Sequence, residues 1–278
     1  MKNISIFILA IFAFSCETIV TDSLVINDSE PLLVIEGGIE RYVDSTDVIQ
    51  SIKLTTTNNF LSNAPNPVVD DAEVNITDSD RTYSLIYQGN GVYSTGDLQP
   101  QIGETYTLEI IWNGAIYTAS DLLNEVPRID SIYTEFEEES LFTDEGYFLK
   151  LNTIDPVGIA NFYHYRVYRN NEFITVPDPG NSRTLRQEDE FFDGQLREGV
   201  EPNEEVIYEV GDLAMVDQMG ISEAYFDFLF QVYNQTGQDG GFVGNPPPAS
   251  IRGNINSTSR ALGFFYAADI HRRSIQVR

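Results

Sequence analysis

The sequence is poor in cysteine and histidine, and both shortages limit the chemistry that it can support. Its 278 residues contain one cysteine, Cys16, so no disulfide can form within the chain and hydrophobic cores must stabilise it alone. The two histidines, His164 and His271, are too few for the usual ligand set of a zinc site. We interpret each as a strand or surface residue rather than as the base of a Ser-His-Asp arrangement. No catalytic residue, metal ligand or cofactor is therefore predicted.

Lysine is nearly absent, and the charge of the chain is strongly negative. Lys2, Lys53 and Lys150 are the only lysines, and the formal net charge is −27. A surface of this sign repels phosphate backbones, which argues against nucleic acid as a partner. Two interpretations of the acidity stay open: solubility in a salty medium, where ions screen the self-repulsion, and binding of cations.

Long hydrophobic runs are missing after the N-terminus, so no transmembrane helix is predicted. At the N-terminus itself, Lys2 precedes a mostly apolar run at residues 4–14. That run is too short to span a bilayer. A positive start, an apolar middle and a small residue at the end are the layout of a secretory signal. We predict that residues 1–15 are a signal peptide and that the rest of the chain folds outside the cytoplasm.

The end of this signal, Ala13-Phe14-Ser15-Cys16, resembles a bacterial lipobox. The resemblance implies cleavage before Cys16, acylation of its thiol and new amino group, and a membrane attachment through lipid alone. Several acyl chains hold a protein firmly, since each buried methylene contributes about 0.8 kcal/mol. Residues 16–31 would then be the lipidated cysteine and a polar tether. The alternatives are a plain signal peptide with an incidental cysteine, and an N-terminal anchor left uncut.

Residues 32–126 alternate between apolar and polar side chains, as half-buried strands do. Asn113-Gly114 predicts a two-residue hairpin turn, because both residues admit the positive φ angles that such a turn needs. Six or seven short strands at this spacing predict a β-sandwich domain over residues 32–126. The residues expected to share one face of the hairpin are Tyr106, Leu108, Ile110, Trp112, Ile116 and Thr118.

Two polar stretches of this domain could hold ligands. The connection at residues 58–71 is rich in asparagine and proline and contains Phe60. Loops of such length in compact domains are often functional, so Phe60 is a candidate ligand-binding residue, and a floppy insertion is the alternative. Asp78 and Asp80 offer hard oxygen ligands, but the twelve-residue pattern of a calcium loop is missing. We interpret them as hairpin turn residues.

Residues 127–278 are β-rich but less regular, and they contain one predicted helix at residues 221–235. Apolar residues recur there at helical spacing, and Ser222 is placed to cap the helix and Gly237 to end it. Because apolar residues also flank the polar stripe, we expect the helix to be buried and to cover the sheet of this second domain. The whole chain is therefore predicted to be mainly β. Strands are expected at residues 129–138, 147–155, 162–168, 251–255, 261–268 and 274–277.

Aromatic residues of the predicted strand at 162–168 are the other candidates for recognition. Tyr163, Tyr165 and Tyr168 lie on both faces of this strand, so some of their rings are expected to be exposed. Exposed rings on a rigid sheet stack on sugars or anchor a peptide or protein partner. Packing between the sheet and the helix is the alternative. Paired carboxylates could hydrolyse glycans, but no spacing marks one pair out, so no enzyme is predicted.

Four groups of residues follow one another along nearly all of residues 16–277. They are Cys16-Glu17 with Leu33-Val34-Ile35-Glu36-Gly37; Gly91-Val92-Tyr93-Ser94 with Gly103-Glu104-Thr105-Tyr106; Val126-Pro127-Arg128-Ile129-Asp130-Ser131; and Pro247-Pro248 with Gly253-Asn254-Ile255 and Leu262-Gly263-Phe264-Phe265. In this order, the groups resemble a family of outer-membrane lipoproteins of Bacteroidota known as domain of unknown function 4249. The resemblance implies an immunoglobulin-like or carboxypeptidase-regulatory-like first domain, and genes beside those of TonB-dependent outer-membrane receptors. It implies no catalytic residues.

The function expected from these features is that of a lipid-anchored, non-enzymatic binding protein or accessory subunit of a TonB-dependent receptor, with a glycan or peptide as its ligand. The alternative is a structural or adhesive envelope protein without a small-molecule ligand. The expected location is the outer membrane, reached through the lipid at Cys16, and the sequence leaves open which face the protein occupies.

Overall fold

The structure is a computed structural model that describes residues 30–46, 48–59, 62–140, 144–174, 186–188, 193–203, 205–236 and 251–278. Over these ranges the chain is mainly β with one helix, which confirms the predicted fold class. The predicted signal peptide, Cys16, most of the tether, Phe60 and Gly237 lie outside the described residues. No helix in these ranges is both long and apolar enough to cross a membrane.

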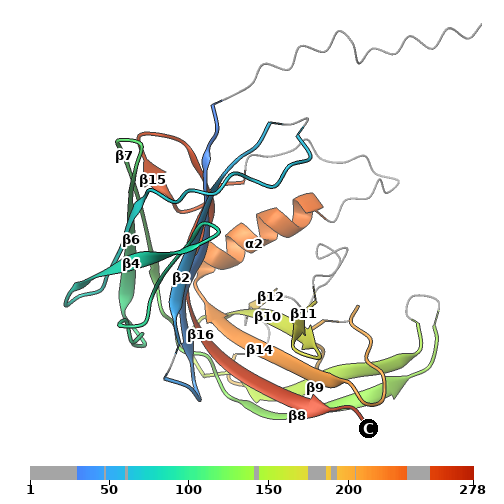
Figure 1. Cartoon of the computed structure of the whole chain (residues 1–278). Helices are drawn as coiled ribbons and strands as arrows, with labels where there is room; N and C mark the ends of the chain where they lie inside the picture. The colour runs from blue at the N-terminus through green and yellow to red at the C-terminus, as the bar shows by residue number, and fades with distance from the viewer. Residues whose placement is uncertain are drawn as a thin grey trace, which may run out of the picture.

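The first part of the chain forms seven strands around one hydrophobic core, in a sandwich-like arrangement (Figure 1). Alternate residues of each strand point into this core, as in β1, where Leu33, Ile35 and Ile39 are buried. The predicted sandwich-like architecture is confirmed. The strands are β1 (Leu33–Tyr42), β2 (Gln50–Thr56), β3 (Glu73–Thr77), β4 (Thr82–Gly89), β5 (Val92–Thr95), β6 (Thr105–Trp112) and β7 (Ala115–Leu122).

The hairpin between β6 and β7 turns at Asn113 and Gly114, whose φ angles are 49° and 74°. The predicted turn is confirmed, but the predicted face of β7 is wrong. A two-residue turn pairs Trp112 with Ala115 and Ile110 with Tyr117, so the odd-numbered residues of β7 share the buried face. Tyr117 is therefore in the core, whereas Ile116 is 52% exposed and Thr118 lies with it on the outer face.

The turn between β3 and β4 confirms the interpretation of Asp78 and Asp80. Asp78 Oδ1 accepts hydrogen bonds from the backbone N–H groups of Asp80 and Arg81, both at 2.8 Å. Its other oxygen accepts a hydrogen bond from the hydroxyl of Tyr83 at 2.9 Å. The side chain of Asp78 thus stabilises the turn by accepting hydrogen bonds from the backbone N–H groups of the turn.

The described residues of the second part form nine strands and the helix α2 (Glu223–Thr236). Two predicted closing strands are wrong: residues 251–255 are irregular, and residues 274–277 are the end of a single long strand rather than a separate edge. The strand at 213–221 was not predicted. The strands are β8 (Ile129–Glu137), β9 (Gly146–Ile154), β10 (Phe162–Arg169), β11 (Glu172–Phe173), β12 (Arg186–Glu188), β13 (Leu196–Val200), β14 (Leu213–Ile221), β15 (Asn256–Ser257) and β16 (Ala261–Gln276).

One sheet of thirteen strands runs through both parts of the described chain, in the order β11-β10-β14-β16-β1-β2-β5-β4-β3-β6-β7-β15, with β12 also paired to β10. The strand β16 joins the two parts of this sheet. It pairs in parallel with β1 over its first ten residues and antiparallel with β14 over its last eight. The boundary at residue 126 stays a prediction, and this sheet crosses it.

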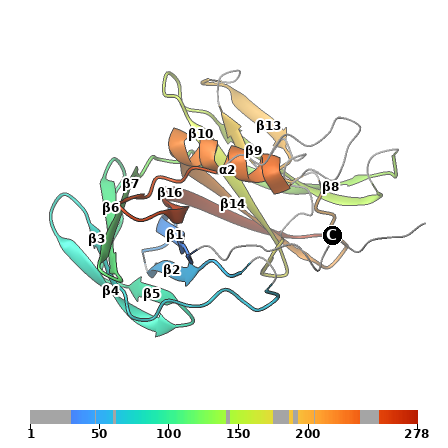
Figure 2. The same cartoon turned by 90° about the horizontal axis from the view of Figure 1, so that it is seen from above.

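In the second part, the sheet lies between two other layers (Figures 1 and 2). A small sheet, β13-β9-β8, packs on one face through Leu149 and Leu151, and α2 lies across the other face. Phe226 of α2 packs against Phe162 with ring centroids 5.2 Å apart. Ser222 caps the helix, since its Oγ accepts a hydrogen bond from the N–H of Tyr225 at 3.1 Å. The predicted helix, its cap and its position over the sheet are confirmed. The further burial expected from the residues beside its polar stripe holds for Phe226 but not for Phe230, which is 46% exposed.

Candidate functional site

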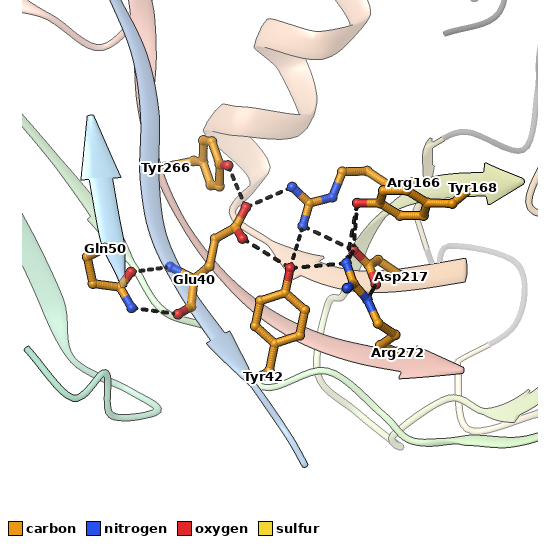
Figure 3. A network of polar contacts seen from close by, with 8 residues as sticks. All are labelled: Glu40, Tyr42, Gln50, Arg166, Tyr168, Asp217, Tyr266 and Arg272. Carbon is orange, nitrogen blue, oxygen red and sulfur yellow. Dashed lines mark hydrogen bonds and ion pairs between the residues drawn. The ribbon is translucent and has the colours of Figure 1, made fainter. Parts of the chain in front are cut away.

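A row of charged side chains crosses the sheet on the face that α2 covers (Figure 3). Arg166 of β10, Asp217 of β14 and Arg272 of β16 are direct neighbours in the register of these three strands. Residues directly opposite one another point to the same face, so both guanidinium groups meet the carboxylate between them. The charge therefore alternates from one strand to the next.

Asp217 is the centre of this row and is fully buried. Its carboxylate accepts hydrogen bonds from Arg272 Nε at 2.5 Å, from Arg272 Nη2 at 2.7 Å and from the hydroxyl of Tyr168 at 3.0 Å. Arg166 Nη2 lies 3.2 Å away. A buried carboxylate is tolerated only where charged partners and hydrogen bonds replace its water. Here that requirement fixes both arginines in place.

Glu40 lies on β1, the strand next to β16, and it binds the Nη atom of Arg166 that Asp217 does not contact. Its carboxylate accepts hydrogen bonds from Arg166 Nη1 at 2.8 Å, from Tyr266 at 2.8 Å and from Tyr42 at 3.2 Å. Burial alone would raise the pKa of Glu40, but the charge of Arg166 and these three hydrogen bonds outweigh it and hold the pKa below its ordinary value. Glu40 is therefore an anion at neutral pH.

The backbone of Glu40 is held by a side chain instead of a neighbouring strand. Gln50 is 1% exposed, and its Oε1 accepts a hydrogen bond from the N–H of Glu40 at 2.8 Å while its Nε2 donates to the carbonyl oxygen at 2.9 Å. The side-chain amide thus continues the ladder where the pairing of β1 with β2 stops at Gly38. This fixes the position from which Glu40 reaches Arg166. We call Glu40, Tyr42, Arg166, Tyr168, Asp217 and Arg272 the network (Figure 3).

Tyr266 lies between the network and the helix. Its ring stacks on Tyr225 of α2, with centroids 4.6 Å apart and planes 9° apart. The opposite residue on β1 is Gly38, where a Cβ would stand 2.0 Å from the carbonyl oxygen of Tyr266. Glycine is therefore required at position 38 for the two strands to approach each other with this ring in place.

The network ends at a cavity of about 670 Å³ that lies beside β16, where β1 ends. Arg272 enters this cavity with its guanidinium carbon 5.0 Å from the ring centre of Tyr42 and 5.1 Å from that of Tyr168. Among the described residues, no group bonds to its Nη1 atom, which leaves two N–H groups for a ligand. The lining residues are Tyr42, Asp44, Ser45, Val48, Ile49, Ile270, Arg272 and Arg273.

The protonation states of the network are fixed near neutral pH. Burial raises the pKa of Tyr168 to about 12, and burial also raises that of Tyr42. The hydrogen bonds to Asp217 raise the pKa of Arg272 further above its already high value. A general acid or base works best with a pKa near the operating pH. These side chains are therefore suited to holding a ligand by charge and hydrogen bonds, and not to transferring protons.

A second cavity, of about 460 Å³, lies where residues 124–128 cross from β7 to β8. Asp269 lines it and is 1% exposed; it accepts hydrogen bonds from Arg41 Nη1 at 2.6 Å and from the N–H of Val126 at 3.0 Å. Burial raises the pKa of Asp269 despite these partners. Asp269 joins β1, β16 and the crossing segment, and both of its oxygens are occupied, so we assign it a structural role.

The structure separates the predicted aromatic residues. Tyr163 and Tyr165 are fully buried between the main sheet and the small sheet, so neither ring is exposed for a ligand, and core packing, the alternative, holds for both. Tyr163 donates a hydrogen bond to Asp155 at 2.5 Å, so its polar end is also occupied. Tyr168 points to the opposite face because β10 alternates, and there it joins the network. Phe60 cannot be placed, since it lies outside the described residues.

The two histidines are both buried. His271 accepts a hydrogen bond at Nδ1 from the N–H of Ile129 at 2.6 Å, and its Nε2 lies 3.3 Å from a carboxylate oxygen of Asp44. Burial and the nearby charge of Arg273 lower the pKa of His271. The imidazole therefore stays neutral and joins β8 to β16. His164 lies on β10 and is 7% exposed.

Sequence reasoning missed most of the network, namely Glu40, Arg166, Asp217 and Arg272. One signal was available in the sequence: polar side chains that recur at every second residue of a strand lie on the same face. Arg166 and Tyr168 are spaced in this way on β10, and Glu40 and Tyr42 on β1. Within the described ranges, no three acidic, histidine or cysteine side chains gather as the ligands of a metal ion would.

Comparison with known proteins identifies the family of this chain. No curated protein matches this sequence. The model of the family described as Domain of unknown function (DUF4249) matches residues 21–274, which include all the described strands from β1 to β15 and most of β16. The chain therefore belongs to the family Domain of unknown function (DUF4249).

Proposed function

We propose that this chain is a non-enzymatic binding protein of the bacterial envelope, held by lipid at Cys16 and associated as an accessory subunit with a TonB-dependent outer-membrane receptor. The observation that carries the binding role is the cavity beside β16, where Arg272 is fixed by Asp217 and two tyrosine rings and still offers Nη1. A preorganised cation at the edge of a cavity binds an anionic group with little loss of side-chain entropy.

The lipid anchor and the receptor are supported by the sequence. The layout of residues 1–16 favours export and acylation, and the resemblance to Bacteroidota lipoproteins favours a receptor of this class as partner. An immunoglobulin-like first domain belongs to the same proposal and is compatible with the sandwich-like arrangement of β1 to β7. A protein bound to the membrane through lipid alone can stay beside a receptor without a membrane-spanning segment of its own.

The test is purification of the full chain, tagged at its C-terminus, from its own cells in mild detergent. We expect an acylated N-terminus at Cys16 by intact-mass spectrometry, and a receptor barrel recovered in comparable amount. The matched variant Cys16→Ala should be released from the membrane and recover no barrel. An unmodified Cys16 would contradict the anchor. An acylated chain without a barrel, in cells whose attachment changes when the gene is deleted, would favour an adhesive role instead.

A further inference from the structure

The last six residues of β16 form an open edge of the main sheet. Pairing with β1 ends where Tyr42 meets Ile270, whereas pairing with β14 continues to Gln276. From residue 271 to residue 276, β16 therefore has a strand on one side only within the described chain. An open strand edge offers unpaired N–H and C=O groups to another extended chain.

The direction of these backbone groups follows from two hydrogen bonds. The carbonyl oxygen of Ile270 accepts from the N–H of Val43, so Ile270 faces the side of β1. Val277 bonds in both directions with Asp212 and Gly211, so it faces the side of β14. Successive residues of a strand alternate, and the backbone groups of Arg272, Ser274 and Gln276 consequently point to the open side. The side chains of these three residues are exposed as well.

The cavity of about 670 Å³ lies along this edge, and its volume is in the range of small-ligand sites. Its apolar wall is formed by Val48, Ile49 and Ile270, and Ile49 is 68% exposed. Its described lining carries two arginines, Arg272 and Arg273, and one carboxylate, Asp44, in a chain whose net charge is −27.

One end of this edge is closed. The chain leaves β1 at Tyr42 and Val43, which occupy the position that an added strand would need beyond Arg272. An added chain must therefore terminate beside Arg272, whose Nη1 atom is open to the cavity. An ammonium terminus would be repelled there, whereas a carboxylate would be bound. This geometry favours the C-terminus of an antiparallel peptide over an internal segment of a larger protein.

We propose that the ligand is a short extended peptide, which adds to the open edge of β16 as an antiparallel strand and places its C-terminal carboxylate on Arg272. The proposal rests on the proposed binding function and specifies its ligand. Backbone hydrogen bonds to Arg272, Ser274 and Gln276 supply sequence-independent affinity, and the wall with Ile49 takes one apolar side chain. Such a site accepts peptides of varied sequence and about six residues.

The first experiment tests the carboxylate. The probe is acetyl-Thr-Val-Thr-Val-Thr-Val with a free C-terminal acid, compared with the same peptide as its C-terminal amide, each titrated into the full chain by isothermal calorimetry. A hydrogen-bonded charge contributes enough that we expect the amide to bind at least about tenfold more weakly. Equal binding of the two peptides, or no binding of the acid, would overturn the proposal.

The second experiment tests the strand edge. Ser274→Pro removes an N–H that points to the open side, and proline is tolerated on edge strands because no ladder bond is lost. Ser274→Ala keeps this N–H and controls for the lost hydroxyl. We expect peptide binding to be lost only in the proline variant, with thermal midpoints of both variants near that of the natural chain. Binding that survives in a folded proline variant would exclude strand addition.

Amide exchange tests the edge without any variant. In the free protein, the amides of Arg272, Ser274 and Gln276 should exchange rapidly and those of Arg273 and Ile275 slowly, and the peptide should protect the first set. Slow exchange of both sets in the free protein would show that the edge is already covered.

The experiments separate the two proposals. A chain that recovers its receptor but binds no peptide refutes only the proposed ligand, and a chain that binds peptide without a receptor refutes only the proposed partner.

Discussion

At Asp217, burial and charge act against each other, and the arginines decide the outcome. The carboxylate is fully buried, yet it has four hydrogen-bonding or ionic contacts from three side chains. Removing one partner of a buried charge pair costs more than the pair contributes, because the remaining charge is left without water or a counterion. The network is therefore sensitive at its centre.

We predict that Asp217→Ala destabilises the protein by about 3 to 5 kcal/mol, since it leaves Arg166 and Arg272 without their shared counterion. The measurement is urea denaturation followed by circular dichroism. The matched control is Glu36→Ala, which removes the exposed ion pair with Lys53 at 3.3 Å and should cost at most about 1 kcal/mol. Similar losses for the two variants would contradict the assigned role of Asp217.

Glu40 gives the network a pH dependence of known sign. Its pKa in the folded protein lies below the ordinary value of 4.5, so the unfolded chain takes up a proton first as the pH falls. The stability that Glu40 contributes is present above about pH 4.5 and is lost as the pH falls through the lowered pKa. We predict that Glu40→Gln is less stable than the natural chain at neutral pH and that the two curves converge in acid. Parallel curves from pH 7 to about pH 3 would contradict this.

Strands are easier to predict than the faces that they bury, and β7 shows why. The Asn-Gly turn determines which residues pair, and a shift of one residue moves every side chain of the strand to the other face. The sequence predicts the turn and the face of β6, but Ile116 and Tyr117 are both apolar enough to be buried. Only the register, which pairs Ile110 with Tyr117, distinguishes them.

The register predicts a large loss of stability at one of these neighbours and a small loss at the other. Tyr117→Ala should cost about 3 kcal/mol, because a large ring that is 4% exposed leaves a cavity in the first core. Ile116→Ala should cost less than about 1 kcal/mol, since its side chain is 52% exposed. Both free energies can be measured by chemical denaturation of otherwise identical chains. A larger loss at Ile116 would mean that the strand pairs one residue out of this register.

The strand β14 was missed for a different reason. Eight of its nine residues are buried, so the period-two pattern that marks a half-buried strand is absent. It also contains Asp217 and Gln218, which interrupt its apolar run, and Ile221 fits the helical spacing of the residues that follow. Burial on both faces comes from the small sheet and α2, and neither contact can be derived from local sequence.

On the scale of the whole molecule, β16 connects what the sequence presents as two domains. Its first half packs Phe265 and Ala267 into the core of the first part, and its second half packs Ile275 against the core of the second, where Val277 follows directly after the strand. The network has the same origin, because Glu40, Arg166, Asp217 and Arg272 come from four strands that are distant in sequence. Spacing along the chain could not predict such a site, whereas the class of fold, the helix and its cap followed from local patterns.

This connection predicts that the two parts unfold together. Trp112 is the single tryptophan and lies on β6, so its fluorescence reports on the first part alone, whereas circular dichroism reports on all strands. Leu151→Ala creates a cavity in the second part, at a residue that is fully buried, and should cost about 3 kcal/mol. If β16 couples the parts, Leu151→Ala lowers the urea midpoint of Trp112 fluorescence as much as that of circular dichroism. Leu108→Ala, in the first part, should also lower both midpoints equally. A Trp112 midpoint that stays at its natural value in Leu151→Ala would show that the first part unfolds by itself, because a cavity outside an independent unit leaves that unit's stability unchanged.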